Sequence, residues 1–462
     1  MVLTGVNSRD QTLPHANNSS LRHHTPDSDG AYQSSSSLSS LMNKTSLTPA
    51  SVISSERKTC VYKYEDKYSF KRFSLPDSLV FDSHFESANL YSAYRYLPSE
   101  SCGRSSESYR DIYELQMAQD VNTTGNTQWF FFKVSNTQPG KVLFKITNFF
   151  KPSSLYERGM KPLIYSSQTV LVEGVSRAPS WMRCGSDVSY TPNDSNIIAA
   201  NNAAENEPEN KEKWPSSGSN FYTLSFSHYF ERSNEMVYFS FCHPFTYSDL
   251  QEYLLLITRK YAFVRRRRLC TTLAGNACDL LTITAPCASL AELRSRSVVI
   301  VMARVHPGET NSSWVMQGLL DFLVLDSIEA QGLRERYIFK IIPMLNPDGV
   351  INGNNRCDIS GVDLNRAWDS PSKQLHPTIY YAKEMIKLAK SRYSIALALD
   401  LHGHSVKEGI FLFGCSPDKK MMLRASSASQ QSPRGGELSE EQSVKPSSRR
   451  EIFQWKINLF SR

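Results

Sequence analysis

Short runs of alternating hydrophobic and polar residues, rich in aromatic side chains, fill residues 75–243. In 142–146, 222–230 and 237–241, large apolar side chains recur at nearly every second position. A period of two is typical of strands with one buried face, so these runs predict an antiparallel β-sandwich domain. The period is lost in 184–220, and we expect a long mobile insertion there.

From residue 244 the pattern changes to continuous apolar runs separated by amphipathic ones. Residues 297–303 and 395–401 are almost uninterrupted apolar runs, as expected for strands that are buried on both faces. A capping box at 246–249 opens a helical pattern, and a second helical pattern covers 377–390. The alternation predicts an α/β domain with a mixed sheet flanked by helices.

The two ends of the chain fit neither pattern. Residues 1–58 are rich in Ser, Asn, Thr and His, so they cannot bury enough apolar surface to offset the entropy of ordering. Residues 425–462 are rich in Ser, Gln and charge, with no strand or strong helix pattern until a short end. We therefore predict a disordered leader (1–58), a β-rich domain (59–243), an α/β domain (244–424) and a divergent tail (425–462).

Composition indicates a soluble chain. Of the 462 residues, 40% are hydrophobic and 21% are charged, and no apolar run is long enough for a transmembrane helix. Nine scattered cysteines without a CxxC pair fit reduced thiols in the cytosol. The net charge of +7 comes without a dense basic stripe interleaved with aromatics. We expect a cytosolic monomer with neither a nucleic-acid nor a membrane partner.

One basic cluster stands out within this mild charge excess. Six positive charges fall within ten residues, at Arg259, Lys260 and Arg265 to Arg268. An acidic peptide would be attracted to such a cluster in a salt-dependent way. A nuclear-localisation signal and a plain solvated face are the alternative interpretations.

Candidate metal ligands follow two of the predicted strands. His306 and Glu309, in HPGE, come just after one strand, and His402 comes just after another. Ligands of open α/β sheets gather at the carboxyl ends of strands, and two histidines with one carboxylate form a catalytic zinc set that leaves a position for water. His404 competes with His402, but a side chain directly after the strand is better held. The alternative is that His306 caps a loop and His402 is an ordinary strand-end histidine.

Loops after the strand at 337–345 carry residues suited to binding a carboxylate substrate. Arginine presents a planar fork of donors, which Arg356 and Arg366 could direct at a carboxylate or a polarised carbonyl. Asn365 lies beside Arg366. Asp363 is placed to accept the free ring N–H of a ligand histidine. Taken alone, each of these residues fits a surface charge or a turn residue better than a substrate-binding role.

Together these segments resemble the zinc metallocarboxypeptidases, through HPGE, NPDG, DLNR and the strand-end His402. The β-rich domain, CHPFTYSDL and LAGNACDLLTIT are similar to the cytosolic carboxypeptidases, also called ATP/GTP-binding-protein-like proteins, particularly types 2 and 3. The resemblance covers about residues 60–424. It implies a carboxypeptidase-like domain with one zinc ion held by His306, Glu309 and His402.

The resemblance also implies a reaction and roles for the loop residues. The reaction is removal of glutamate from polyglutamylated or glutamate-tailed proteins, tubulin foremost, in the cytosol at microtubules, centrioles or cilia. Asn365 and Arg366 match the pair that binds the substrate's C-terminal carboxylate. Arg356 matches the arginine that stabilises the oxyanion, and Asp363 matches the acid behind the metal ligands.

The sequence departs from the family after residue 424. In the family, a glutamate downstream of the third ligand is the general base, and none of Glu437, Glu440 and Glu441 lies in a comparable pattern. We therefore expect a catalytic domain that is incomplete at its C-terminal end, such as alternative splicing would produce, and doubtful turnover. Two other functions stay open, a non-catalytic protein that binds tubulin or another partner and a zinc amidohydrolase of the acylase type.

Overall fold

The computed structural model describes residues 58–64, 77–96, 109–167, 170–172, 175–177, 180–193, 221–414 and 454–459. All of these described residues belong to one compact unit. The predicted leader lies outside the described residues up to Lys58, where the first strand begins.

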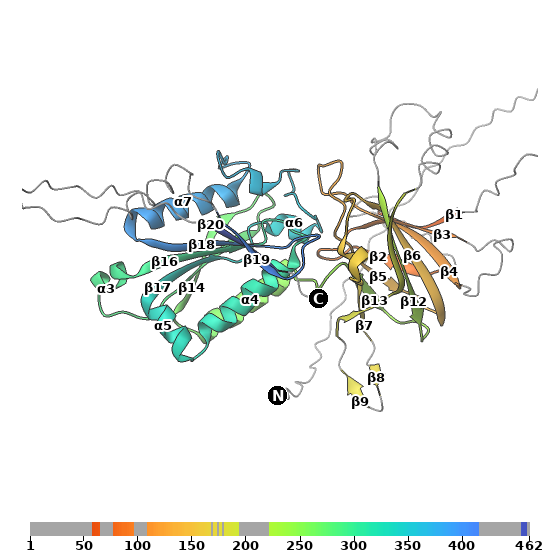
Figure 1. The fold of residues 1–462 in the computed structure, drawn as a ribbon, viewed down its shortest axis with the longest axis horizontal. Coiled ribbons are helices and arrows are strands. Elements are labelled where there is room, and N and C mark those ends of the chain that lie inside the picture. The colour runs from red at the N-terminus through yellow and green to blue at the C-terminus, as the bar shows by residue number, and fades with distance from the viewer. Residues whose placement is uncertain are drawn as a thin grey trace, which may run out of the picture. The chain divides into compact units, whose positions relative to one another are not determined.

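Two sheets form the N-terminal domain (Figure 1). The first has the order β1-β3-β4-β6-β12-β11 and consists of β1 (Lys58–Lys63), β3 (Leu90–Tyr96), β4 (Asp111–Met117), β6 (Gly140–Phe149), β12 (Tyr222–Phe230) and β11 (Ser186–Pro192). The second has the order β10-β7-β13-β5-β2 and consists of β10 (Met182–Arg183), β7 (Leu163–Ser166), β13 (Val237–Ser240), β5 (Phe131–Ser135) and β2 (Val80–Asp82). A hairpin of β8 (Val170–Val172) and β9 (Val175–Arg177) and a 3-10 turn, η1 (Leu155–Arg158), complete it.

Aromatic side chains fill the space between these two sheets. Phe144 of β6 stacks on Phe226 of β12 with ring centroids 5.3 Å apart, and it meets Phe239 of β13 at 5.1 Å. All three are fully buried. The period of two in the sequence therefore marks the inward face of each strand, and the predicted sandwich is confirmed.

Two details of the sandwich differ from the prediction. The predicted insertion at 184–220 starts too early, because Ser186–Pro192 forms β11, which pairs with β12. In β11 only Tyr190 is buried, so this edge strand has almost no apolar periodicity to reveal it. The sheet is also not purely antiparallel, because β4 runs parallel to β6.

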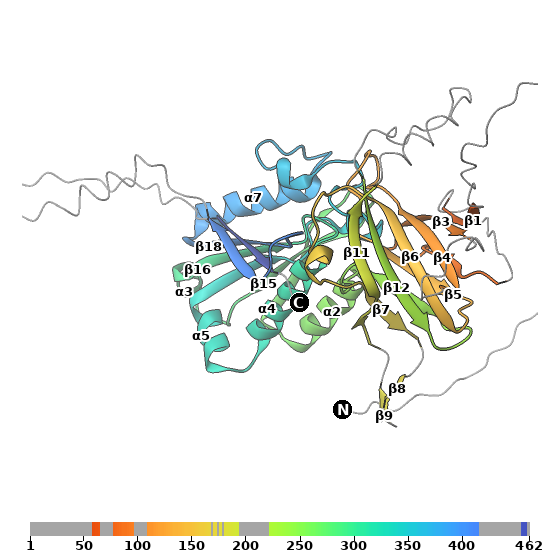
Figure 2. The same ribbon diagram turned by 45° about the vertical axis from the view of Figure 1, so that its right-hand side comes forward.

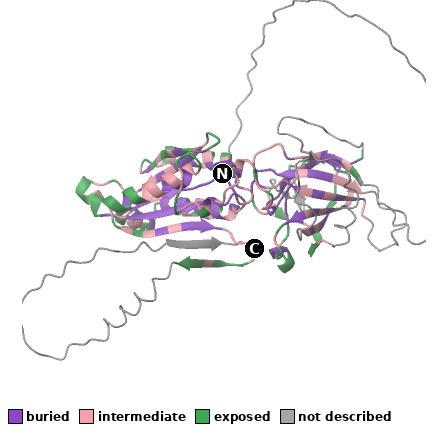
Figure 3. Ribbon diagram, turned by 90° about the horizontal axis from the view of Figure 1, so that it is seen from above, coloured by how far each residue is buried: buried purple, intermediate pink, exposed green. Residues whose placement is uncertain are grey.

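A seven-stranded mixed sheet forms the second domain, as predicted. Its order is β14-β15-β17-β16-β18-β20-β19, with β14 (Val264–Thr271), β15 (Ala277–Ile283), β17 (Tyr337–Ile342), β16 (Ser297–Ala303), β18 (Ile395–His402), β20 (Gln454–Leu459) and β19 (Ile410–Gly414). The four strands β17, β16, β18 and β20 run parallel, and the other pairings are antiparallel. The buried central strands are shown in Figure 3.

Helices cover both faces of this sheet (Figure 2). They are α2 (Tyr247–Lys260), α3 (Leu290–Ser295), α4 (Thr310–Val324), α5 (Ile328–Arg336), α6 (Pro347–Ile351) and α7 (Pro377–Arg392), together with the 3-10 turn η2 (Leu364–Arg366). Val299 and Val301 of β16 pack with residues of α2 and α4, whereas Val298 and Ile300 pack with residues of α7. Successive side chains of a strand point to opposite faces, so a strand covered on both sides must be apolar throughout.

One strand comes from the segment that we predicted to be a divergent tail. Gln454–Leu459 forms β20, which inserts between β18 and β19. The sequence signal is the alternation of Trp455, Ile457 and Leu459, which is too short to separate from chance. No helix in the described part of the chain combines the length and apolarity needed to cross a membrane.

Candidate metal centre and substrate cavity

The loop after β16 positions the first two candidate ligands. The strand ends at Ala303, the chain turns through HPGE, and Glu309 is the N-cap of α4. Gly308 is required in this turn because a Cβ atom there would lie 2.6 Å from Oδ1 of Asn355. The Gly308 N–H donates to the Asn355 carbonyl at 2.8 Å, which ties this loop to the one after β17.

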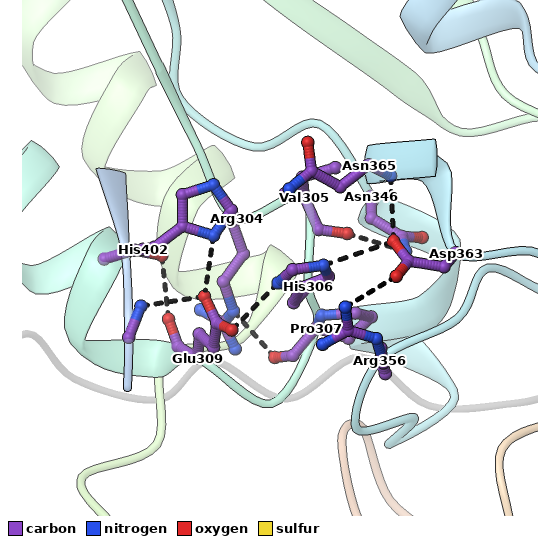
Figure 4. A network of polar contacts seen from close by, with 12 residues as sticks. Arg304, Val305, His306, Pro307, Glu309, Asn346, Arg356, Asp363, Asn365 and His402 are labelled. Carbon is purple, nitrogen blue, oxygen red and sulfur yellow. Dashed lines mark hydrogen bonds and ion pairs between the residues drawn. The ribbon is translucent and has the colours of Figure 1, made fainter. Parts of the chain in front are cut away.

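The third candidate ligand arrives on the neighbouring parallel strand. Ala303 of β16 pairs with Leu401 of β18, so both strands end at the same edge of the sheet and His402 lies beside the HPGE loop. The ligand atoms of His306, Glu309 and His402 all lie within 4.8 Å of one another. Glu309 stands between the imidazoles, with Oε1 at 2.8 Å from His306 Nδ1 and Oε2 at 3.1 Å from His402 Nδ1 (Figure 4).

Each histidine presents its other nitrogen to a carboxylate. His306 Nε2 lies 3.2 Å from Asp363 Oδ1, and His402 Nε2 lies 2.8 Å from Asp400 Oδ2. Carboxylates behind metal-binding histidines fix the ring orientation and the tautomer, so this donor set fits a zinc ion. We predicted the contact of Asp363 but not that of Asp400. The signal for Asp400 was its position two residues before His402, on the same face of the strand.

Charge strongly perturbs the ionisable groups of this cluster. Burial disfavours the charged form of Glu309, but His306 and His402 outweigh it and hold the pKa of this carboxyl far below its usual range. Burial alone would lower the pKa of His402, yet hydrogen bonds with Asp400 and Glu309 raise it to about 9. The cluster therefore pairs an anionic carboxylate with two histidines whose protonated forms are favoured. A bound cation would take the place of those histidine protons.

A buried arginine holds the HPGE loop through hydrogen bonds. Arg304 is 2% exposed, and its guanidinium donates to the Pro307 carbonyl at 2.7 Å, to the Phe245 carbonyl at 3.1 Å and to Ser313 Oγ at 2.8 Å. Its backbone is left-handed, with φ of 57°. The sequence pattern does not reveal the role of Arg304, because nothing local marks an arginine after a strand as buried.

The loop after α6 brings Arg356 next to the outer carboxylate. Nη2 of Arg356 lies 2.7 Å from Oδ2 of Asp363, whose other oxygen contacts His306. Burial opposes ionisation of Asp363, but His306 and Arg356 hold its pKa well below the usual range. Arg356, Asp363 and the metal cluster thus form one continuous polar network (Figure 4).

The sandwich domain holds this loop in place. Both carboxylate oxygens of Asp120 accept backbone N–H groups, from Asn355 at 2.6 Å, Arg356 at 2.7 Å and Cys357 at 2.7 Å. Burial raises the pKa of Asp120 to about 6, although these three donors act in the opposite direction. A contact across more than 230 residues leaves no trace in the local sequence pattern, so Asp120 was not predicted as part of the site.

The remaining predicted residues lie at the edge of this network. Asn365 and Arg366 belong to η2, and the Asn365 N–H donates to Asp363 Oδ1 at 2.9 Å. Arg366 is exposed. His404 is outside the cluster, because its Nδ1 accepts the backbone N–H groups of the following turn.

The segment that holds the candidate ligands is similar to known zinc carboxypeptidases. Residues 250–406, which include all three candidate ligands, match the zinc carboxypeptidase family, peptidase M14. The chain is 41% identical over 355 residues to cytosolic carboxypeptidase 1 of Danio rerio, covering 75% of this chain and 28% of that protein. It is 38% identical over 382 residues to cytosolic carboxypeptidase 3 of Bos taurus, covering 78% and 34%. Residues 250–406 therefore form a zinc carboxypeptidase domain, and the chain is similar to the cytosolic carboxypeptidases.

The matches to the cytosolic carboxypeptidases do not separate the types, and they cover only part of each relative. Cytosolic carboxypeptidase 2 of Xenopus tropicalis is 40% identical over 344 residues, so types 1, 2 and 3 match almost equally, and the predicted preference for types 2 and 3 is not distinguished. The chain spans 28% to 34% of the length of these relatives. The family match favours a carboxypeptidase over an acylase-type amidohydrolase.

Solved structures share the fold of this chain. A metallo-carboxypeptidase from Burkholderia cenocepacia superposes with a TM-score of 0.54 at 19% identity, covering 83% of this chain and 90% of that one. One from Pseudomonas aeruginosa gives a TM-score of 0.50 at 20% identity, covering 82% and 89%. This coverage is too large for the carboxypeptidase domain alone, so the shared fold includes the sandwich.

A cavity of about 490 Å³ opens beside the metal cluster of the carboxypeptidase domain. His306, Glu309 and Arg356 line it from this domain, and Gln128, Lys151 and Arg183 line it from the sandwich. Asn365 and Arg366 are not among its lining residues, and Glu309 is the one carboxylate in the described wall. The downstream glutamates weighed as general bases, Glu437, Glu440 and Glu441, lie outside the described residues.

Proposed function

We propose that the carboxypeptidase domain holds one zinc ion through His306, Glu309 and His402 and removes C-terminal glutamate from acidic protein tails. The single observation that carries this proposal is the convergence of the three ligand atoms within 4.8 Å, with a carboxylate behind each histidine. Bound zinc supplies a Lewis acid that polarises the scissile carbonyl and activates a water molecule.

The chain's own residues supply binding and orientation. Asp363 and Asp400 fix the two imidazoles by accepting their outer ring N–H groups. Arg356 offers guanidinium donors beside the cluster, suited to negative charge on the carbonyl oxygen. Asn365 and Arg366 are the residues we propose for the terminal carboxylate of the substrate, because amide and guanidinium donors match its two oxygens.

The charge of the cavity supports an acidic substrate. Its described wall contains the cations Lys151, Arg183 and Arg356 against the single carboxylate of Glu309, which we assign to the metal. A cleft of one sign attracts substrates of the opposite sign. We propose that the chain acts in the cytosol on polyglutamylated or glutamate-tailed proteins, with tubulin as the leading candidate.

Hydrolysis of defined peptides tests this function. The zinc-loaded chain should release glutamate from a peptide that ends in several glutamates, and it should not act when the terminal carboxylate is amidated. His306→Ala and His402→Ala should abolish release, whereas His404→Ala should retain it. Release that is unaffected by both ligand substitutions would contradict the assignment of the site.

A second function is favoured by one observation, the lack of a carboxylate other than Glu309 in the described cavity wall. A general base contributes about 10²- to 10⁴-fold in rate, so a chain without one would hold acidic tails without cleaving them efficiently. The same peptide separates the two functions. Binding without measurable glutamate release supports the binding protein, and release that is lost in Glu309→Ala supports the enzyme.

A further inference from the structure

Gln128 is a buried polar side chain for which the fold supplies no partner. The residue is 4% exposed, and neither Oε1 nor Nε2 has a hydrogen-bond partner among the described residues. Most buried side-chain polar groups are paired, because an unmade hydrogen bond in the interior is costly. Gln128 lines the cavity of the metal cluster, so its amide is available to a molecule that enters there.

Lys151 lines the same cavity and also belongs to the sandwich domain. It follows β6, and its backbone carbonyl accepts the Tyr190 hydroxyl at 2.5 Å, which fixes its position. The structure gives its Nζ neither a hydrogen bond nor an ion pair within the described part of the chain. Burial lowers the pKa of Lys151, and the charge of Glu309, which lines the same cavity, acts in the opposite direction.

The location of the cavity shows which part of a substrate reaches these two residues. The proposed function places the terminal carboxylate at Asn365 and Arg366, which do not line the cavity, and the scissile carbonyl at the metal and Arg356, which does. In this orientation the polypeptide that precedes the scissile bond would leave through the cavity. Gln128 and Lys151, which line the cavity, would then face the acyl side of the substrate.

We propose that Gln128 and Lys151 form a subsite for the side-chain carboxylate of an acidic residue that precedes the C-terminal residue of the substrate. The inference rests on the proposed function, because it uses the direction in which the substrate is bound there. An ammonium and an amide N–H both donate to a carboxylate, and the amide oxygen of Gln128 can accept a peptide N–H from the same substrate.

This subsite assigns a function to the sandwich domain. Its contribution is to select substrates in which acidic residues come in succession, because a single terminal glutamate would leave both side chains unused. Recognition would thus require side chains from two domains, which the contacts of Asp120 with the loop of Arg356 hold together.

Binding of inert peptides to the full zinc-loaded chain tests the subsite. The probes are acetyl-Gly-Glu-Glu-Glu and acetyl-Gly-Gln-Gln-Glu, each with the last peptide bond replaced by a ketomethylene group, so that turnover does not interfere. Calorimetry should show that the wild type binds the acidic probe about tenfold more tightly, the value expected for one charge-assisted hydrogen bond.

The variants isolate the two side chains. Lys151→Met should reduce this preference to about threefold or less, with the affinity for the Gln-Gln-Glu probe unchanged. Gln128→Leu should also reduce the preference, and it should weaken both probes, because it removes the acceptor of the peptide N–H as well. Gln128→Glu should lower the affinity for the acidic probe further, because it places a carboxylate against a carboxylate. Lys145→Met is the matched control, since Lys145 lies on β6 of the same domain but does not line the cavity.

The outcomes separate this inference from the proposed function. A tenfold preference that persists in Lys151→Met and Gln128→Leu, or a wild type without any preference, overturns the subsite. If such a chain still releases glutamate from peptides, the proposed function stands alone. A preference that the variants abolish in a chain without turnover supports the subsite and contradicts the proposed activity.

Discussion

Asp120 and Arg356, 236 positions apart in sequence, are joined by a 2.7 Å hydrogen bond from the Arg356 backbone N–H to the Asp120 carboxylate. The same carboxylate also accepts the N–H groups of Asn355 and Cys357. The guanidinium of Arg356 in turn contacts Asp363, which contacts His306. One side chain of the sandwich domain therefore sets the backbone that carries the proposed oxyanion arginine.

Removing this acceptor should destabilise the chain. Asp120→Ala leaves three backbone N–H groups without their partner, and we expect a loss of about 3 kcal/mol in the free energy of unfolding. Asp120→Asn keeps the shape and should lose less. Urea unfolding measures both, with Glu335→Ala as an exposed control. A loss below about 0.5 kcal/mol in Asp120→Ala, the range of ordinary surface substitutions, would contradict the role of Asp120.

Asp400 should influence metal affinity although it is not one of the three proposed ligands. It accepts the outer N–H of His402 at 2.8 Å, and loss of such a partner typically costs about 10- to 100-fold in affinity. We expect that range for Asp400→Ala and a smaller change for Asp400→Asn, measured by competition with a chromophoric zinc chelator. The exposed Asp369→Asn serves as the control, and equal affinities in all of these proteins would refute the prediction.

Zinc should stabilise the folded chain. A ligand that binds only the native state adds stability as its concentration rises above Kd, about 4 kcal/mol at 1,000 times Kd. The melting temperature of the metal-free chain should therefore rise with added zinc, and that of His306→Ala should not. A parallel rise in both proteins would point to zinc binding elsewhere on the chain.

Acid should weaken the sandwich domain through His228. Burial against Phe230 and Phe239 lowers the pKa of His228 to about 4 in the folded chain, below the unfolded value of about 6.5. The neutral form is favoured by folding, so this contribution is complete above pH 6.5 and is lost as the pH falls towards 4. Between pH 7 and pH 5 we expect a loss of roughly 1 to 2 kcal/mol.

His228→Phe tests this assignment because it keeps a ring but removes the titration. Urea unfolding at pH 7 and pH 5 should show a smaller loss in this variant than in the wild type. Tyr229→Phe, on the same strand, should lose as much as the wild type does. An unchanged acid loss in His228→Phe would assign the effect to other groups.

The sequence predicted the elements whose apolar period is long, and it missed those whose pairing depends on distant segments. The two-sided apolar run of β16 and the alternating run of β6 were sufficient to place a buried parallel strand and a sandwich strand. β11 and β20 were missed, since an edge strand with one buried residue and a six-residue strand carry little local signal.

The same division holds for the site. His306, Glu309 and His402 were predictable because strand ends and spacing fix them, and Asp363 because it precedes the paired Asn365 and Arg366. Asp120, Gln128 and Lys151 reach the site only through the packing of the sandwich against the loop of Arg356. Periodicity cannot indicate such a contact, because it describes one element at a time.

Zinc content after exhaustive dialysis tests the central claim most directly. The purified wild type and His404→Ala should each retain close to one zinc ion per chain, because three ligands remain in place. His306→Ala and His402→Ala should retain almost none. Full zinc retention in both ligand variants, or its loss in His404→Ala alone, would contradict the metal centre described by His306, Glu309 and His402.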